Sequence, residues 1–112
     1  MISRELYEQS NHISGNHDRI FMTVGGMGHA FMIAFGIAKN RPEKKVMCID
    51  GDGAVLMHME ALPFIASQAP ENFYHIVINN QAHESVGAIP TRCQQADFAR
   101  IAAATGYLRI EN

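Results

Sequence analysis

The sequence has few of the features that mark several classes of protein. Its 112 residues include no tryptophan and only two cysteines, Cys48 and Cys93, which resemble neither a disulfide framework nor a closely spaced metal pair. No apolar run approaches the roughly 18 residues of a membrane span, and the first twelve residues lack the apolar core of a signal peptide. We therefore expect a cytoplasmic protein with two free thiols.

Charge of either sign is also scarce. Charged residues make up 18% of the chain and the formal net charge is -2, so no basic excess indicates nucleic acid and no acidic run indicates disorder. The hydrophobic content of 47% is typical of a globular domain. The length allows one domain at most.

Apolar runs alternate with helical patterns along the chain. Strands are predicted at 20–24, 45–50 and 73–78, with a fourth beginning at 108–112. Helices are predicted at 2–9, 29–40 and 96–107 and over most of 54–68, where Pro63 marks a late start or a kink, and 10–18 and 81–92 are predicted as connections. Near-continuous apolar strands are covered on both faces, which indicates an α/β fold with a doubly wound parallel sheet.

Three polar or glycine-rich clusters follow the first three predicted strands. They are Gly-Gly-Met-Gly at 25–28, Gly-Asp-Gly at 51–53 and Asn-Asn-Gln-Ala-His at 79–83. Ligands of open parallel sheets bind beyond the carboxyl ends of the strands. The clusters are therefore expected to meet at one edge.

Asp52 and Asn80 would place two side-chain oxygens at that edge if their strands are neighbours. Magnesium binds such oxygens, with phosphate and water completing its shell. The glycines at 51 and 53 allow close approach of an anion to the backbone. The alternative for this motif alone is an ordinary turn in which Asp52 caps the following helix. In either case we expect Asp52 at a surface position.

The spacing of these motifs resembles the signature of the thiamine-diphosphate-dependent enzymes. Gly-Asp-Gly is followed, after the 25 residues 54–78, by Asn-Asn at the end of an apolar strand. The resemblance implies the diphosphate-binding domain of that family, with magnesium held by Asp52, Asn80 and the backbone carbonyl of Ala82. The cofactor-binding residues implied are Gly25, Gly26, Met27, Gly28, Gly51, Asp52, Gly53, Ala54, Asn80, Ala82 and His83.

The first glycine cluster carries the other half of the resemblance. Family members place a turn of this kind where the cofactor bends, which gives the carbonyl of Gly25 to the aminopyrimidine and wedges Met27 between the rings. The alternative for Met27 is filling of the core. His29 and His83 are expected near the cofactor, whereas no converging partners are expected for the remaining histidines, His12, His17, His58 and His75.

Within the family, the segments 23–38, 50–62 and 79–91 most resemble the branch that decarboxylates phosphonopyruvate, in phosphonate metabolism. The branch that acts on sulfopyruvate, a close relative of the first, is the alternative. Ala88 and Ile89 depart from the usual loop pattern of the phosphonopyruvate branch, so a shift in substrate specificity is expected if this loop contacts the substrate. Residues 1–112 are expected to form a partial diphosphate and magnesium domain without the pyrimidine-binding domain. No catalytic residue is therefore assigned here.

The activating glutamate is expected on a partner domain or subunit of an oligomeric lyase, so the lone chain is expected to be inactive and to expose an apolar face around Met27 and Phe31. Two different functions stay open beside the decarboxylase. The chain could be a catalytically incomplete scaffold protein that binds thiamine diphosphate, or an unrelated flavodoxin-like phosphate-binding module.

Overall fold

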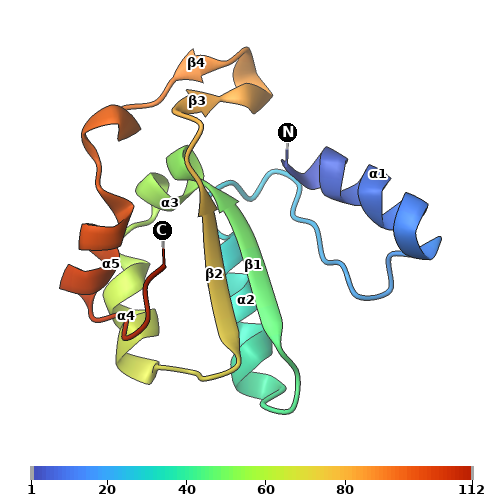
Figure 1. Cartoon of the computed structure of the whole chain (residues 1–112), viewed down its shortest axis with the longest axis horizontal. Coiled ribbons are helices and arrows are strands. Elements are labelled where there is room, and N and C mark those ends of the chain that lie inside the picture. Colours follow the sequence, from blue (N-terminus) through green and yellow to red (C-terminus); the bar gives the residue numbers. More distant parts are fainter. Residues whose placement is uncertain (1, 112) are drawn as a thin grey trace.

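The computed structural model describes residues 2–111 (Figure 1). Its α-helices are α1 (Ile2–Ser14), α2 (Ala30–Asn40), α3 (Asp52–Met57), α4 (Ala61–Gln68) and α5 (Phe98–Thr105). Its strands are β1 (Val46–Gly51), β2 (Phe73–Ile78), β3 (Ala82–His83) and β4 (Ile89–Pro90), and the short 3₁₀ turns η1 (Glu84–Val86) and η2 (Cys93–Gln95) flank β4. None of the described helices is long and apolar enough to cross a membrane.

The centre of the fold is a parallel pair of strands. β1 pairs with β2 in the register Val46↔Phe73 to Gly51↔Ile78, and the connection between them runs through α3 and α4. The predicted α/β fold with parallel strands is thus confirmed. Because the strands are in register, their carboxyl ends finish side by side, and α3 and the β3–β4 hairpin lie beyond them (Figure 1).

The core lies between one face of this sheet and the helices. Phe31 and Phe35 of α2, Cys48 of β1 and Ile65 of α4 are all buried in one cluster, onto which residues of α5 also pack. The alternate strand residues face the other way, and Met47, Tyr74, Ile76 and Ile78 are exposed. Within the described chain, the helices therefore cover one face of the sheet.

Most elements form where the sequence predicts them. β2 has the predicted bounds, β1 begins and ends one residue later than predicted, and α2 begins one residue later. Pro63 lies in the first turn of α4, so it marks a late start. The C-terminal helix stops at Gly106, whose φ of 101° is readily adopted by glycine. The connection at 81–92 contains the short β3–β4 hairpin, which was not predicted.

The first helix is longer than predicted. It continues through residues 10–14, where Ser10 and Ser14 donate their hydroxyls to the carbonyls of Tyr7 and Ser10 instead of competing for backbone amides, and it ends before Gly15, which has a φ of 66°. The expectation that His17 has no partner is wrong. Ser10 Oγ lies 2.7 Å from His17 Nδ1, and the His17 ring stacks on Tyr7.

Two predicted strands do not form within the described residues. Residues 20–24 run as an irregular connection in which Phe21 and Val24 are 68% and 98% exposed, and residues 108–111 are also irregular, with Leu108 86% exposed. Both segments favour strand by residue type, but a strand needs a neighbour for its backbone hydrogen bonds. Neither segment has such a neighbour in the sheet that the structure describes.

Candidate functional site

The parallel pairing of β1 and β2 places two of the predicted clusters at one edge. Gly51 is the partner of Ile78 in the ladder, so Asp52 and Asn79 follow at the same level of the sheet. The condition on which the sequence argument depended, that the two strands are neighbours, is therefore met. The remaining cluster, Gly-Gly-Met-Gly at 25–28, reaches the same edge by packing against α3.

Asp52 is the best-fixed side chain at this edge. It is 1% exposed, which corrects the expected surface position, and it is the first residue of α3 rather than its N-cap. Thr91 Oγ1 donates a hydrogen bond of 2.7 Å to Asp52 Oδ2. The β3–β4 hairpin makes this contact possible, because it brings the chain back to Asp52 at Thr91.

The protonation state of Asp52 follows from these contacts. Burial raises the pKa of the carboxyl, but hydrogen bonds from Cys93, Thr91 and the backbone amides at 52 and 53 lower it by more, so the pKa lies below its usual value of 3.8. Asp52 is therefore a carboxylate at neutral pH, and its negative charge faces the strand ends.

Asn80 and Ala82 form the second side of the edge. Asn80 Oδ1 accepts a hydrogen bond of 3.2 Å from the amide of Ala82, which is an Asx turn, and the Asn80 side chain is exposed. Ala82 itself lies in β3, paired with Pro90, so it has an extended backbone that alanine adopts without strain. The positive φ of this loop falls instead on Gln81, at 60°.

His83 lies directly on the Gly-Asp-Gly backbone. A Cβ placed on Gly53 would come within 2.2 Å of His83 Cε1 and 2.6 Å of its Nδ1, so a larger residue at 53 would displace this ring. His83 therefore lies at the same edge as Asp52, and its ring packs the β3–β4 hairpin against α3.

The Gly-Gly-Met-Gly turn packs against the other side of α3. Gly28 has a φ of 85°, and a Cβ there would lie 2.4 Å from His58 Nδ1 and 3.0 Å from the carbonyl oxygen of Ala54. The His29 ring contacts the His58 ring in a tilted arrangement, with centroids 4.2 Å apart and an interplanar angle of 39°. His58 thus has partners at this turn, which corrects the expectation that it has none.

Met27 extends from this turn with 42% of its surface exposed. It is outside the buried core, which disfavours the alternative that it fills the interior. An exposed apolar face was expected around Met27 and Phe31. Met27 is exposed, but Phe31 is completely buried, so the expectation is wrong for Phe31. The exposed apolar residues that flank Met27 in sequence are Phe21 and Val24.

Comparison with known proteins assigns the chain to a family. The family profile described as "Thiamine pyrophosphate enzyme, C-terminal TPP binding domain" matches residues 6–111. The chain belongs to the thiamine pyrophosphate enzymes. The match covers all three clusters and nearly the whole described chain.

Several relatives support the assignment. A phosphonopyruvate decarboxylase of Streptomyces viridochromogenes is 38% identical over 108 residues, which are 96% of this chain and 26% of that protein. A sulfopyruvate decarboxylase subunit beta of Methanothermobacter thermautotrophicus is 33% identical over 105 residues, 94% of this chain and 54% of that subunit. A putative acetolactate synthase large subunit of Mycobacterium tuberculosis is 34% identical over 87 residues. The chain thus spans about a quarter of the first of these relatives and about half of the second.

Two residues of this thiamine pyrophosphate enzyme domain's candidate site escape sequence reasoning. Thr91 and Cys93, both buried, provide the hydrogen bonds to Asp52, yet they are separated from it by about forty residues without any periodic pattern. The available signal was weak: Thr91 comes directly after Pro90, near the end of the loop that follows the predicted ligand Asn80.

Proposed function

We propose that this domain binds the diphosphate end of thiamine diphosphate, together with Mg²⁺, as part of a 2-oxo acid decarboxylase. One observation carries the proposal: the in-register pairing of β1 and β2 sets Asp52 and Asn80 at one sheet edge, where the Gly-Gly-Met-Gly turn also packs. The family assignment supports the same cofactor.

The donor set fits a magnesium ion. Asp52 offers a carboxylate, Asn80 an amide oxygen and Ala82 a backbone carbonyl, and hard cations of this size prefer such oxygens. Thr91 fixes the Asp52 carboxylate through Oδ2, and the Asx turn fixes Asn80. The site is thus organised before the ion binds, which lowers the entropic cost of binding.

The remaining site residues suit the organic part of the cofactor. Gly51 lies where β1 passes into α3, so its backbone can approach a diphosphate closely, whereas Gly53 and Ala54 are buried beside it and the His83 ring lies over Gly53. Gly25, Gly26, Met27 and Gly28 would contact the rings, with Met27 as the exposed apolar side chain between them. When bound, thiamine diphosphate supplies the electron sink for loss of carbon dioxide. The protein's part is to orient it, hold its charge and exclude water.

For the substrate, we propose 3-phosphonopyruvate, decarboxylated to phosphonoacetaldehyde and carbon dioxide. The phosphonopyruvate decarboxylase relative and the sequence of the 83–91 loop support this choice. Sulfopyruvate is the alternative, supported by the subunit beta relative. Both substrates are anions, so a loop that begins at His83 beside the diphosphate site is well placed to distinguish them.

We also propose that a pyrimidine-binding domain or subunit completes the site. It would supply the carboxylate that activates the aminopyrimidine, to which none of the glutamates here is assigned. One relative is named as a subunit, and this chain spans about a quarter of another relative. The exposed Met27 and Val24 would then lie toward that partner.

Binding of the cofactor is the direct test. Thiamine diphosphate is titrated into the full chain by calorimetry with and without Mg²⁺, and then into Asp52→Asn and Asn80→Ala. We expect binding that requires Mg²⁺ and weakens at least about tenfold in both variants, while Asp18→Asn, which changes an exposed aspartate, binds like the wild type. Equal affinity in Asp52→Asn would contradict the metal assignment.

Activity is tested separately, on the chain assembled with a pyrimidine-domain partner. Carbon dioxide release is followed with phosphonopyruvate, sulfopyruvate and pyruvate. Turnover of phosphonopyruvate above the other two supports the substrate, and preference for sulfopyruvate selects the alternative. Cofactor binding without turnover by the assembly would favour a scaffold role instead.

A further inference from the structure

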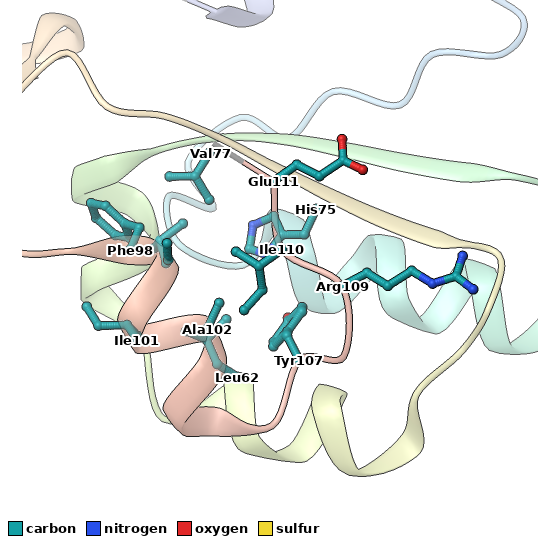
Figure 2. Close-up of a pocket in the computed structure, with 12 residues that line it drawn as sticks. Leu62, His75, Val77, Phe98, Ile101, Ala102, Tyr107, Arg109, Ile110 and Glu111 are labelled. Atoms are coloured by element: carbon teal, nitrogen blue, oxygen red, sulfur yellow. The ribbon is translucent and has the colours of Figure 1, made fainter.

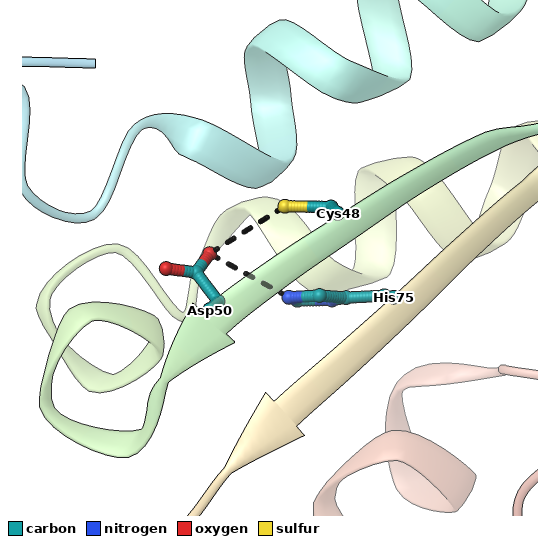
Figure 3. A group of neighbouring side chains, drawn as sticks. All are labelled: Cys48, Asp50 and His75. Carbon is teal, nitrogen blue, oxygen red and sulfur yellow. Dashed lines mark hydrogen bonds and ion pairs between the residues drawn. The ribbon is translucent and has the colours of Figure 1, made fainter. Parts of the chain in front are cut away.

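A second polar cluster lies inside the core, away from the strand edge. Cys48 and Asp50 project from alternate positions of β1, and His75 is the ladder partner of Cys48 on β2 (Figure 3). Cys48 and Asp50 are each 5% exposed, and the side chain of His75 is also 5% exposed. The sequence-based expectation that His75 lacks converging partners is therefore wrong.

The contacts within this cluster leave one of its members without a hydrogen bond. Cys48 Sγ donates a hydrogen bond of 3.9 Å to Asp50 Oδ2, and His75 Nε2 lies 3.6 Å from the same oxygen. His75 Nε2 is buried and has no hydrogen-bond partner. A buried carboxylate beside a buried, unpartnered imidazole nitrogen is unfavourable unless something further joins them.

We propose that Cys48, Asp50 and His75 bind a transition-metal ion of the Zn²⁺ class. The three ligand atoms all lie within 4.8 Å of one another. Tetrahedral Zn²⁺ with its usual bond lengths needs ligand atoms about 3.3–3.6 Å apart. The Asp50–His75 and Cys48–Asp50 separations of 3.6 and 3.9 Å exceed this by a few tenths of an ångström at most, and the Cys48–His75 separation is at most 4.8 Å, so side-chain rotations would bring the three atoms closer as the ion binds.

The chemistry of the donors selects this class of metal over Mg²⁺. Thiolate sulfur and imidazole nitrogen are ligands of Zn²⁺ and related ions, whereas Mg²⁺ prefers oxygen alone. Cys48 binds as the thiolate, so its proton leaves Sγ for solvent as the metal–sulfur bond forms. A thiolate, a carboxylate, a neutral imidazole and a divalent cation sum to zero charge, which suits a buried position.

His75 also lines a cavity of about 180 Å³ next to α5 (Figure 2). Tyr107 lines it too, and its hydroxyl is a second buried polar atom without a partner. The volume holds several waters at about 30 Å³ each, and the two side chains offer them polar partners. The cavity therefore leaves room for water beside the His75 ring, and a water there would supply the fourth ligand of the proposed ion.

Cobalt is the probe for this site, because thiolate-bound Co²⁺ gives a near-ultraviolet charge-transfer band and tetrahedral Co²⁺ absorbs strongly in the visible. The full chain is stripped with chelator, supplied with excess Mg²⁺ to fill oxygen sites, and titrated with Co²⁺ without thiamine diphosphate. We expect one equivalent to bind with both bands, and stoichiometric Zn²⁺ to remove them. Because no cofactor is present, the result is independent of the proposed decarboxylase function.

The two cysteines supply matched variants. In Cys93→Ser the only thiol left is Cys48, so the charge-transfer band is expected to persist. In Cys48→Ser the band should disappear and Co²⁺ affinity should fall at least about tenfold, while Asp50→Asn should keep the band with similarly weakened binding. If Cys48→Ser fails to fold, Cys93→Ser still decides. Absence of the band from the wild type, or its loss in Cys93→Ser, would overturn the proposal.

Discussion

The hydrogen bond from Thr91 to Asp52 gives the most direct quantitative test of the site. Thr91→Val keeps the shape of the side chain and removes the hydroxyl, which leaves Asp52 Oδ2 without its 2.7 Å donor. Both residues are at most 5% exposed, so water does not readily replace the lost partner. A hydrogen bond to a charged group contributes about 1.5–3 kcal/mol. We expect the metal-free domain to lose about that much unfolding free energy at pH 7.

The loss is large enough to measure and small enough to leave the chain folded. Domains have unfolding free energies of about 5–15 kcal/mol, and a domain of this size loses roughly 4–8 °C in Tm for each kcal/mol. Urea and thermal unfolding in the presence of chelator should therefore show a Tm about 10 °C lower. Thr91→Ser, which keeps the hydroxyl, should lose about 1 kcal/mol or less.

The pH dependence separates this bond from ordinary packing. The pKa of Asp52 in the folded domain lies below its unfolded value, so its stabilising contribution is present above about pH 4 and is lost as the pH falls through the folded pKa. Thr91 is one of the groups that lower this pKa. The difference between wild type and Thr91→Val should thus be greatest at neutral pH and shrink in acid.

A control variant tests whether any lost threonine hydroxyl has this effect. Thr105 Oγ1 bonds only to helix carbonyls, at 2.9 Å to Ile101 and 3.0 Å to Ala102. Thr105→Val should therefore change stability by less than about 1 kcal/mol, with no acid dependence. Equal stability of Thr91→Val and Thr91→Ser at pH 7, or a difference that does not change with pH, would refute the reasoning.

Three further predictions concern other parts of the fold. Met27→Ala should change the unfolding free energy by less than about 1 kcal/mol, whereas the loss for a buried methionine is about 2–5 kcal/mol. In the assembled enzyme, the same substitution should slow exchange of the bound cofactor's thiazolium C2 proton by up to about 100-fold, as followed by NMR. Burial raises the pKa of Cys48 from 9.0 to about 12. The unfolding free energy of the metal-free protein, measured with urea, should therefore fall by about 1.4 kcal/mol per pH unit between these values, and the fall should be smaller in Cys48→Ala. Ala88→Gly, at a φ of 56°, should raise Tm through a gain of up to about 1 kcal/mol; an unchanged Tm would argue against strain there.

The sequence predicted the elements whose patterns are local. α2, β1 and β2 are nearly continuous apolar segments bounded by glycine, proline or asparagine, and each forms within a residue of its expected ends. Because neighbouring parallel strands bring their carboxyl ends together, these predictions placed Asp52 and Asn80 at one edge on the condition that the strands are neighbours, and the pairing of β1 with β2 meets that condition.

What the sequence did not predict depends on contacts between distant segments. Residues 20–24 favour strand but have no neighbour in the described sheet, and no local pattern reports on that. The burial of Asp52 follows from the return of the chain at Thr91 after the β3–β4 hairpin, which no periodicity encodes. The packing of His83 on Gly53 is likewise visible only in three dimensions.

Asp50 and Asp52 show how two carboxylates in one segment acquire different chemistry. Asp50 is the last inward-facing residue of β1, so its neighbours are a thiol and an imidazole, whereas Asp52 begins α3 and meets a hydroxyl and backbone amides. The first environment adds a thiol and an imidazole, which are ligands of ions of the Zn²⁺ class, whereas the donors around Asp52 stabilise an ionised carboxylate, whose oxygens a hard ion prefers. Since Asp50 and Asp52 are only two residues apart, a cation bound beside one carboxylate reduces the electrostatic repulsion between the two. Co²⁺ bound at Cys48 should therefore alter Mg²⁺ affinity at Asp52, and by linkage the reverse effect must have the same magnitude.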